Sequence, residues 1–535
     1  MTLLGSVFLF SEPEVVHAAG TPCSITPVLT EANLNTCIAE APTDNSEFTI
    51  TLGASFNLTT TKSIAAGRNI TLISANPASP ATLTRDSGFA GRLFSVSANL
   101  PNIATLTIDS VIIDSNNQTF AANNQLIYTV GTGDVTVNLS GNTVLKNNNS
   151  TSNGGTILIY AASNKLNIAG NAQIISNTTT GTGNIYTYGV VTMSGGTVTG
   201  NTANHGGGFL INNGGTLNMT GGAISDNTAE RGGGIYMPNG TLNMTNSQVS
   251  SNTATNAGGG IYIAAGTLNL YGGATISDNI ATNVGGGIRV QYGTEANMYA
   301  GAAITGNTAA NYCGGASILG TLNMYGGEIS GNDAENSGGG VCLHGTAAVA
   351  KLNMPIGSTG IISNNTAKTD GGGVWITQAI ENTLDMLGGT ISDNTAENGG
   401  GVWLDVGTAN IAGGNVTGNI ATLDGGGVFT EDYDNLFVGA SAVFSGNRAA
   451  SSSPVRNPAD DAIYAANILG TNWTTPFTQG YNNYDINHDH APNAPGTGLF
   501  GDQISSAAIS ALSATASAAA IIAVFAARKL LAKRH

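Results

Sequence analysis

The sequence predicts an all-β protein, a single-stranded parallel β-helix with three short strands in each coil. Three observations predict it. A run of three glycines recurs about every 27 residues through the middle of the chain. The short segments between these runs alternate apolar and polar residues, which is the period of a strand with one buried face. Glycine makes up 75 of the 535 residues and charged residues only 9%, which favours many short strands joined by tight turns.

The glycine runs mark one corner of the repeat. Glycine and asparagine supply the left-handed backbone that sharp turns need. A Cys-Gly-Gly sequence at 313–315 fills the one gap in the series. The runs lie at residues 206–208, 232–234, 258–260, 285–287, 338–340, 371–373, 399–401 and 425–427.

Three segments follow one another in each coil. The first comes directly after the glycines, as at 261–263; the second reads Leu-Asn-Met, as at 242–244; the third reads Ile-Ser-Asp-Asn, as at 276–279. Because coils stack about 4.8 Å apart, equivalent residues should form ladders along the axis. One internal slot is expected to hold Met193, Met219, Met244, Met298, Met324, Met354 and Met386. Stacked amides that bond to each other and to turn backbone are expected from Asn201, Asn227, Asn252, Asn279, Asn307, Asn332, Asn365, Asn394, Asn419 and Asn447.

The N-terminal residues are expected to be an export signal followed by a cap. Residues 1–19 combine an apolar run with small residues suited to signal-peptidase cleavage. We interpret them as part of a signal peptide whose real start lies upstream of Met1. The alternative is an ordinary frayed terminus. Residues 20–45 should cap the β-helix of 46–450, because an open coil edge invites aggregation. Cys23 and Cys37 are a candidate disulfide in this cap.

The other two cysteines are expected to stay unpaired. Cys342 falls at an outward-facing position and Cys313 at a turn, so their side chains should not meet.

The C-terminal part is expected to anchor the protein. Residues 451–493 carry four prolines and should form an end cap and linker. Residues 503–527 carry no charge and are long enough to span a bilayer as a helix, and the basic tail at 528–535 would stay in the cytoplasm.

The order at 494–498, Ala-Pro-Gly-Thr-Gly, resembles the cell-wall sorting signal of Gram-positive-type bacteria. The resemblance implies that Pro495, Thr497 and Gly498 are read by a sortase-type transpeptidase. Cleavage after Thr497 would join the chain to peptidoglycan. The family usually has Leu at the position of Ala494, and the alternative is a plain membrane anchor at 503–527.

The repeat itself resembles a known pattern. Gly233-Gly234-Ile235 and Phe444-Ser445-Gly446-Asn447 match the Gly-Gly-x-Ile and Phe-x-x-Asn motifs of polymorphic outer-membrane proteins and related bacterial surface adhesins, although Ile or Val usually stands here in place of Phe. The resemblance covers about residues 140–450. It implies a right-handed parallel β-helix at the cell surface more than it implies any chemistry.

The best candidate site lies near the end of the repeats. One outward-facing column holds Trp375, Trp403 and Phe429, and the next places Asp405 beside Glu431 on adjacent coils. Aromatic rings bind sugars, and paired carboxylates are what glycoside hydrolysis requires. The five residues are therefore the candidate ligand site, with Asp405 and Glu431 as the candidate catalytic pair. The alternative is that the rings only suit strands and the acids are merely solvated.

Metal and cofactor sites are not expected. Asp226 and Asp278 occupy equivalent positions two coils apart, too far to share one calcium ion. Residues 485–489 begin like a calcium loop but lack its glycine and closing glutamate, and His488 and His490 are expected to be exposed.

The sequence favours a cell-surface adhesin or surface-layer-type binding rod. Its ligand would be a glycan or protein of a host or a neighbouring cell. The alternatives are an extracellular polysaccharide-degrading enzyme, hydrolase or lyase-like, and a structural coat protein without ligand. The 16 basic and 32 acidic residues, a net charge of −16, exclude nucleic acid as the main partner.

Overall fold

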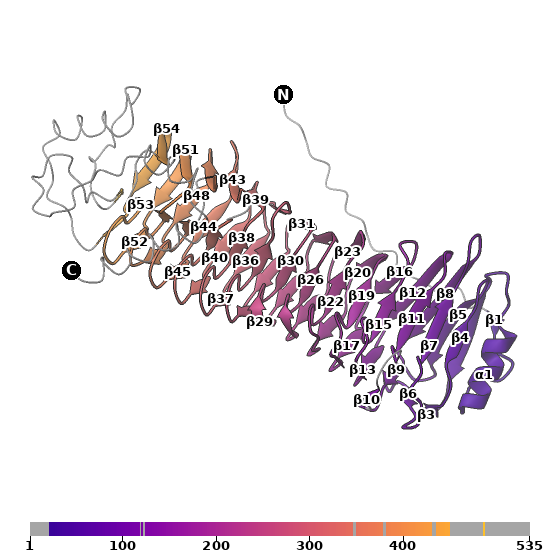
Figure 1. Ribbon diagram of the computed structural model, residues 1–535. Helices are drawn as coiled ribbons and strands as arrows, with labels where there is room; N and C mark the ends of the chain where they lie inside the picture. Colours follow the sequence, from indigo (N-terminus) through magenta and orange to yellow (C-terminus); the bar gives the residue numbers. More distant parts are fainter. Residues whose placement is uncertain are drawn as a thin grey trace, which may run out of the picture. The chain divides into compact units, whose positions relative to one another are not determined.

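The structure is a computed structural model that describes residues 21–117, 119–120, 124–345, 349–377, 381–430, 435–449 and 485–486. It is a right-handed parallel β-solenoid of about 14 turns, which confirms the predicted parallel β-helix. Figure 1 shows its coils stacked in one row, from helix α1 (Glu31–Glu40) to strand β54 (Leu436–Ser445). The predicted helix at 503–527 lies outside the described residues. Among the residues described, no helix is long and apolar enough to cross a membrane.

The coils contribute strands to a 14-stranded, a 29-stranded, an 8-stranded and a 3-stranded sheet within the described residues. The 14-stranded sheet contains β4 (Lys62–Ile64), β7 (Phe94–Ser97), β11 (Ile127–Val130), β15 (Ile157–Ile159), β19 (Ile185–Thr187), β22 (Phe209–Ile211), β26 (Ile235–Met237), β30 (Ile261–Ile263), β34 (Ile288–Val290), β38 (Ala316–Ile318), β42 (Val341–Leu343), β46 (Val374–Ile376), β50 (Val402–Leu404) and β53 (Val428–Thr430).

The 29-stranded sheet takes two strands from most coils. With β54, it contains β1 (Thr21–Pro22), β2 (Glu47–Leu52), β3 (Phe56–Leu58), β5 (Asn69–Ser74), β6 (Thr82–Arg85), β8 (Ile103–Asp109), β9 (Ile112–Asp114), β12 (Asp134–Ser140), β13 (Val144–Lys146), β16 (Lys165–Ile168), β17 (Gln173–Ile175), β20 (Val190–Met193), β21 (Thr197–Thr199), β23 (Gly215–Met219), β24 (Ala223–Ser225), β27 (Gly240–Met244), β28 (Gln248–Ser250), β31 (Gly266–Leu270), β32 (Thr275–Ser277), β35 (Glu295–Met298), β36 (Ala303–Thr305), β39 (Thr321–Met324), β40 (Glu328–Ser330), β43 (Lys351–Met354), β44 (Ile361–Ser363), β47 (Thr383–Met386), β48 (Thr390–Ser392) and β51 (Thr408–Thr417).

The two small sheets close the third side of the coils. The 8-stranded sheet contains β25 (Thr228–Arg231), β29 (Thr253–Ala257), β33 (Ile280–Ala281), β37 (Thr308–Ala309), β41 (Asp333–Ala334), β45 (Thr366–Ala367), β49 (Thr395–Ala396) and β52 (Ile420–Ala421), and the 3-stranded sheet contains β10 (Thr119–Phe120), β14 (Asn149–Ser150) and β18 (Thr178–Thr179). The sequence predicted three strands in each coil and missed this fourth one. Most of these strands hold only two residues, too few to show an alternation.

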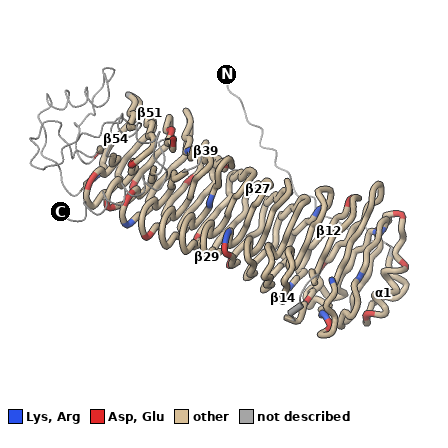
Figure 2. Tube along the Cα trace, viewed as in Figure 1, with Lys and Arg blue, Asp and Glu red and all other residues tan. Residues whose placement is uncertain are grey.

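The strands pair in the register that the ladders require. The triplet Ile261-Tyr262-Ile263 pairs residue for residue with the strand before it and the strand after it. All seven methionines of the predicted slot are buried to 1% exposure or less, which confirms the slot as core. Charged residues are sparse along the coils (Figure 2), so stability rests on stacked apolar side chains and hydrogen bonds.

The glycine runs are required by the backbone of the turn. Gly258, first in its run, has φ 65°, where other residues are strained. A Cβ atom on the next residue, Gly259, would lie 2.3 Å from the carbonyl oxygen of Gly286 on the following coil. At the second position of the run, coils can therefore stack only where a side chain is absent.

The predicted asparagines form a continuous buried ladder, here called the buried Asn ladder. Each side chain is at most 4% exposed. Asn279 is representative: its Oδ1 accepts from the backbone N–H and the Nδ2 of Asn252 at 3.0 and 2.9 Å, and its Nδ2 donates to Val249 O and Asn307 Oδ1. The ladder begins earlier than predicted. Asn177 bonds to Asn201 in the same way, and Asn148 donates its backbone N–H to Asn177 Oδ1.

The buried Asn ladder has a direction, and its two ends carry opposite charges. Every Nδ2 from Asn177 onward donates to the next coil, so the carbonyl ends of the amides face the N-terminal end. There Arg85 Nε donates to Ser115 Oγ at 2.9 Å, and Ser115 donates to Asn148 Oδ1 at 2.7 Å. At the other end Asn447 Nδ2 donates to Asp485 Oδ1 at 2.8 Å. A cation thus meets the negative end of the aligned dipoles, and an anion meets the positive end.

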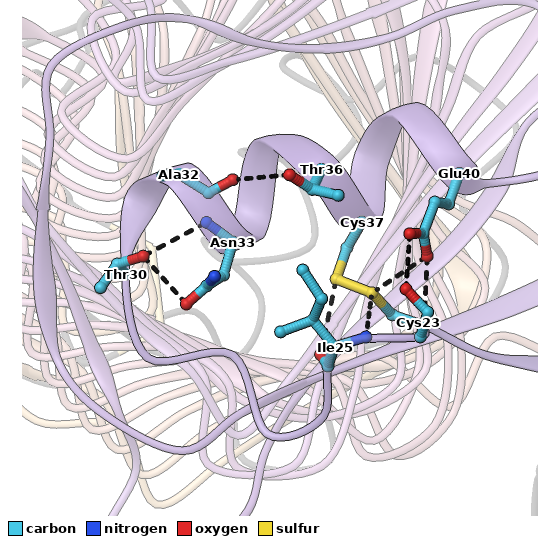
Figure 3. The surroundings of a disulfide bond; sticks show 9 residues. Cys23, Ile25, Thr30, Ala32, Asn33, Thr36, Cys37 and Glu40 are labelled. Atoms are coloured by element: carbon cyan, nitrogen blue, oxygen red, sulfur yellow. Dashed lines mark hydrogen bonds between the residues drawn. A yellow bond between two sulfur atoms is a disulfide. The ribbon is translucent and has the colours of Figure 1, made fainter.

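A helical cap closes the N-terminal end of the solenoid. Helix α1 begins after Thr30, whose side chain accepts from the backbone N–H of Asn33, as an N-cap residue does. Its buried residues Leu34, Cys37 and Ile38 join the core. Figure 3 shows Cys23 and Cys37 joined in the disulfide that the sequence suggested. This bridge ties α1 to the segment that pairs with the first coil.

An ion pair holds the other side of the cap. Lys62, only 1% exposed, donates to Glu31 Oε1 at 2.5 Å, Asn35 Oδ1 at 2.9 Å and Thr60 Oγ1 at 2.8 Å. Glu31 also accepts from the backbone N–H of Thr59 at 2.8 Å. The Glu31 carboxylate of α1 is thereby bonded to residues 59–62, which lead into β4.

Acid should loosen this cap. Burial by itself would raise the pKa of Glu31, but the hydrogen bonds from Lys62 and Thr59 outweigh it and lower this pKa from 4.5 to about 2. Since the folded pKa lies below that of the unfolded chain, the stabilisation is complete above about pH 4.5 and disappears as the pH falls toward 2. We expect a loss of at most about 3 kcal/mol over this interval, measured as the urea midpoint for loss of α1. A Glu31→Gln variant should lack the acid-dependent step; the same step in both proteins would contradict the assignment.

Candidate functional site

The outward column of the 14-stranded sheet carries the predicted aromatic residues. The middle residue of each strand points away from the core, and the register places Cys342, Trp375, Trp403 and Phe429 in line on successive coils. The sequence therefore placed Trp375, Trp403 and Phe429 in the correct column. Each of the three is half-buried between its neighbours.

Tyr312 adds a fourth ring that the sequence reasoning missed. It lies 5.3 Å from Trp375, centroid to centroid, with the two ring planes 6° apart. Trp375 and Trp403 are 6.1 Å apart and tilted by 32°, and Trp403 and Phe429 are 6.5 Å apart and stacked. These four residues are called the aromatic row. The rings are nearly parallel in the outer two pairs and tilted in the central pair, so the four together form one apolar strip along the axis.

Tyr312 and Trp375 can stack although one coil lies between them, because that coil carries the small residue Cys342 at this place. Its side chain is short and 0% exposed although it belongs to the outward column, so the rings on the coils before and after it close over it. It forms a disulfide with Cys313, and the expectation that these cysteines stay unpaired was wrong. Cys313 occupies the first position of a glycine run with φ 65°. On the next coil, a Cβ on Gly338 would lie 2.2 Å from Cys342 Sγ, so this sulfur leans over the turn rather than outward.

One polar row borders the aromatic row on the side of the turns. The residue directly before each glycine run stacks with its equivalent, and Asp370 pairs with Asn398 in this way. Asn398 Nδ2 donates to Asp370 Oδ1 at 3.3 Å, and Ser337 Oγ donates to Asp370 Oδ2 at 3.4 Å. Asp424 holds the same position one coil later. The sequence could have revealed this row, because each of its residues directly precedes a glycine run. Tyr312 occupies the same position in its own coil.

The predicted carboxylate pair is only partly described. Asp405 is half-buried and accepts from Thr377 Oγ1 at 3.2 Å, on the far side of the aromatic row from Asp370. Glu431 lies outside the described residues, so the pair stays a prediction. What the structure places together is a strip of rings with Asp370 and Asn398 on one margin and Asp405 on the other.

The described residues include some of those considered for metal binding and none of the predicted sorting residues. No group of three or more His, Cys, Asp or Glu side chains is placed to hold a metal within the part of the chain that is described. Asp226 and Asp278 each lie in a turn with φ 56°. His488, His490 and the sorting residues Pro495, Thr497 and Gly498 lie outside the described residues.

Compared with protein-family models, with characterised proteins and with solved structures, the chain matches none.

Proposed function

We propose that the protein is a cell-surface binding rod, an adhesin that holds an extended polysaccharide along the aromatic row. The observation that carries the proposal is the aromatic row itself, with a carboxylate and an amide on one side, Asp370 and Asn398, and the Asp405 carboxylate on the other. Sugars present apolar C–H surfaces to rings and hydroxyl donors to acceptors. Asp370 and Asp405, on opposite margins, supply acceptors for such hydroxyls. A row that follows the solenoid axis suits a ligand that is itself a chain.

Anchoring belongs to the same proposal. Residues 494–498, the uncharged 503–527 and the basic tail 528–535 support covalent attachment to peptidoglycan by a sortase-type transpeptidase, or retention in the membrane. The export signal at 1–19 supports secretion. Many copies on one cell would strengthen individually weak contacts by avidity.

The test is retention of the full-length chain on a panel of immobilised polysaccharides, scored together with the release of new reducing ends. We expect retention without product. The Trp403→Ala variant should weaken retention about tenfold, equivalent to roughly 1.4 kcal/mol, because the ring at the centre of the strip is lost. The matched control is Tyr299→Ala, which removes a ring from a stacked Tyr271–Tyr299–Tyr325 row elsewhere on the surface.

Three other outcomes are informative. Product that disappears in an Asp405→Asn/Glu431→Gln variant would replace the adhesin with the polysaccharide-degrading enzyme. Equal weakening by Tyr299→Ala would move the contact away from the aromatic row. A wild-type chain that no polysaccharide retains would rule out the proposed role and leave a structural coat.

A further inference from the structure

A polar cluster interrupts the same outward column before the aromatic row begins. The register places Tyr262, Arg289, Ser317, Cys342 and Trp375 in line, one on each coil. Arg289 is thus the cationic member of a column that is otherwise aromatic, small or apolar from Tyr236 onward. Three coil steps separate it from Trp375, about 14 Å at 4.8 Å for each step.

Arg289 is held by neutral groups. Its Nη1 donates to Ser317 Oγ at 3.5 Å, and that hydroxyl bonds to His344 Nε2 at 2.8 Å. Ser317 is 0% exposed, whereas Arg289 and His344 keep part of their surface. On the other side Tyr262 OH accepts from Gln291 Nε2. The guanidinium therefore lies in a framework of fixed hydroxyl, imidazole and phenol groups.

The charge of Arg289 has no carboxylate partner in the described part of the chain. None of the ion pairs found there includes it, and its Nε is buried without a hydrogen-bond partner. Burial and the charge of Arg289 lower the pKa of His344 to about 3, so the imidazole is neutral at physiological pH. Arg231 is a second positive charge that acts on Arg289. Its guanidinium lies 5.8 Å from the centroid of the Tyr262 ring and is paired with Glu230 at 3.7 Å.

A half-buried guanidinium without a carboxylate partner is costly, because burial removes water from the charge. The cost is offset when an oxyanion completes the site, because the planar fork of arginine matches a carboxylate or sulfate and the desolvated surroundings strengthen the contact. The side-chain framework is already in place for such a group.

We propose that Arg289, supported by Ser317, His344 and Tyr262, binds one carboxylate or sulfate group of the ligand. This inference rests on the binding role proposed above and specifies its substrate class: an acidic polysaccharide that follows the outward column from Arg289 to the aromatic row. The neutral imidazole of His344 adds no charge of its own and orients the Ser317 hydroxyl.

The experiment compares retention of the full-length chain on immobilised polygalacturonate and on a neutral glucan. Arg289→Gln should weaken retention on polygalacturonate about tenfold or more and leave any retention on the glucan unchanged. Lys351→Gln is the matched control, because Lys351 is an exposed cation of β43 in the 29-stranded sheet. Trp403→Ala should weaken retention on both. Urea midpoints of all variants establish that they are folded.

A second measurement needs no variant. The ¹⁵N resonance of Arg289 Nε in the wild-type chain should shift when a galacturonate oligomer is added, and also with sulfate. Retention on polyglutamate but not on polygalacturonate would replace the polysaccharide with an acidic peptide and overturn the proposal.

The failures are distinguishable. Binding that Trp403→Ala abolishes and Arg289→Gln leaves intact would overturn the anion position while the binding role stands. A shift of the Arg289 resonance without retention on any polysaccharide would preserve the anion site and reject the polysaccharide. No shift and no retention would overturn both.

Discussion

Replacing Asn279 with alanine should lower the free energy of unfolding of the surrounding coils by about 3–5 kcal/mol. The side chain is 0% exposed and makes four hydrogen bonds with three residues, Asn252, Val249 and Asn307. Alanine would remove the buried partner of two donors on Asn252 and of the Val249 carbonyl, each costing about 1–3 kcal/mol before relaxation. Asn307 Oδ1 would keep its bond from the backbone N–H of residue 279. Because coils contact only their neighbours, the damage should be local rather than global.

Hydrogen exchange of backbone amides measures this effect coil by coil. Protection should fall on the coils of Asn252, Asn279 and Asn307 and persist near α1. Asn269→Ala is the matched control. Asn269 lies on the same coil in a second, half-buried line of stacked amides, here called the outer ladder, in which its side chain bonds to Asn243 and Asn297. This substitution should cost about 1 kcal/mol or less. Equal losses from both variants would show that the buried Asn ladder adds nothing beyond the outer one.

Replacing Lys62 with alanine should detach the N-terminal cap. The ammonium is bonded to Glu31, Asn35 and Thr60, and removing one member of a buried pair costs about 3–5 kcal/mol. Hydrogen exchange of Glu31–Glu40 should become fast while β20 and later strands keep their protection. With the first coil uncovered, its open strand edge should pair with other molecules, which light scattering detects as association that depends on protein concentration.

Lys165→Ala is the control for loss of a lysine, since Lys165 is exposed at the start of β16. A chain with Lys62→Ala that keeps α1 protected and stays monomeric would show that the Cys23–Cys37 disulfide and the buried residues Leu34 and Ile38 hold the cap by themselves.

The periodicity of the sequence predicted which residues share a column, and it did so correctly. The methionine slot, the buried Asn ladder and the line of Trp375, Trp403 and Phe429 follow from a repeat that fixes register. Periodicity does not show which side chains lean from one column into another. The Cys313–Cys342 disulfide, the stacking of Tyr312 on Trp375 and the Ser317–His344 contact all join different columns and were missed.

The ends of the buried Asn ladder were missed for a different reason. Arg85 and Ser115 precede the regular repeats, and Asp485 follows Asn447 by 38 residues instead of one coil length. No fixed spacing points to them. Only the hydrogen bonds of the folded chain place these residues at the ends of the ladder.

Because the buried Asn ladder bonds in the same way on every inner coil, the length of the solenoid can change while the fold stays the same. Each inner rung accepts from the coil before it and donates to the coil after it in the same way. A whole coil can therefore be duplicated or deleted in frame without changing what Arg85 or Asp485 meets. Length then varies in steps of about 4.8 Å. Duplication of a coil on the N-terminal side of the aromatic row would lengthen the solenoid toward α1 and leave the chemistry of the row intact.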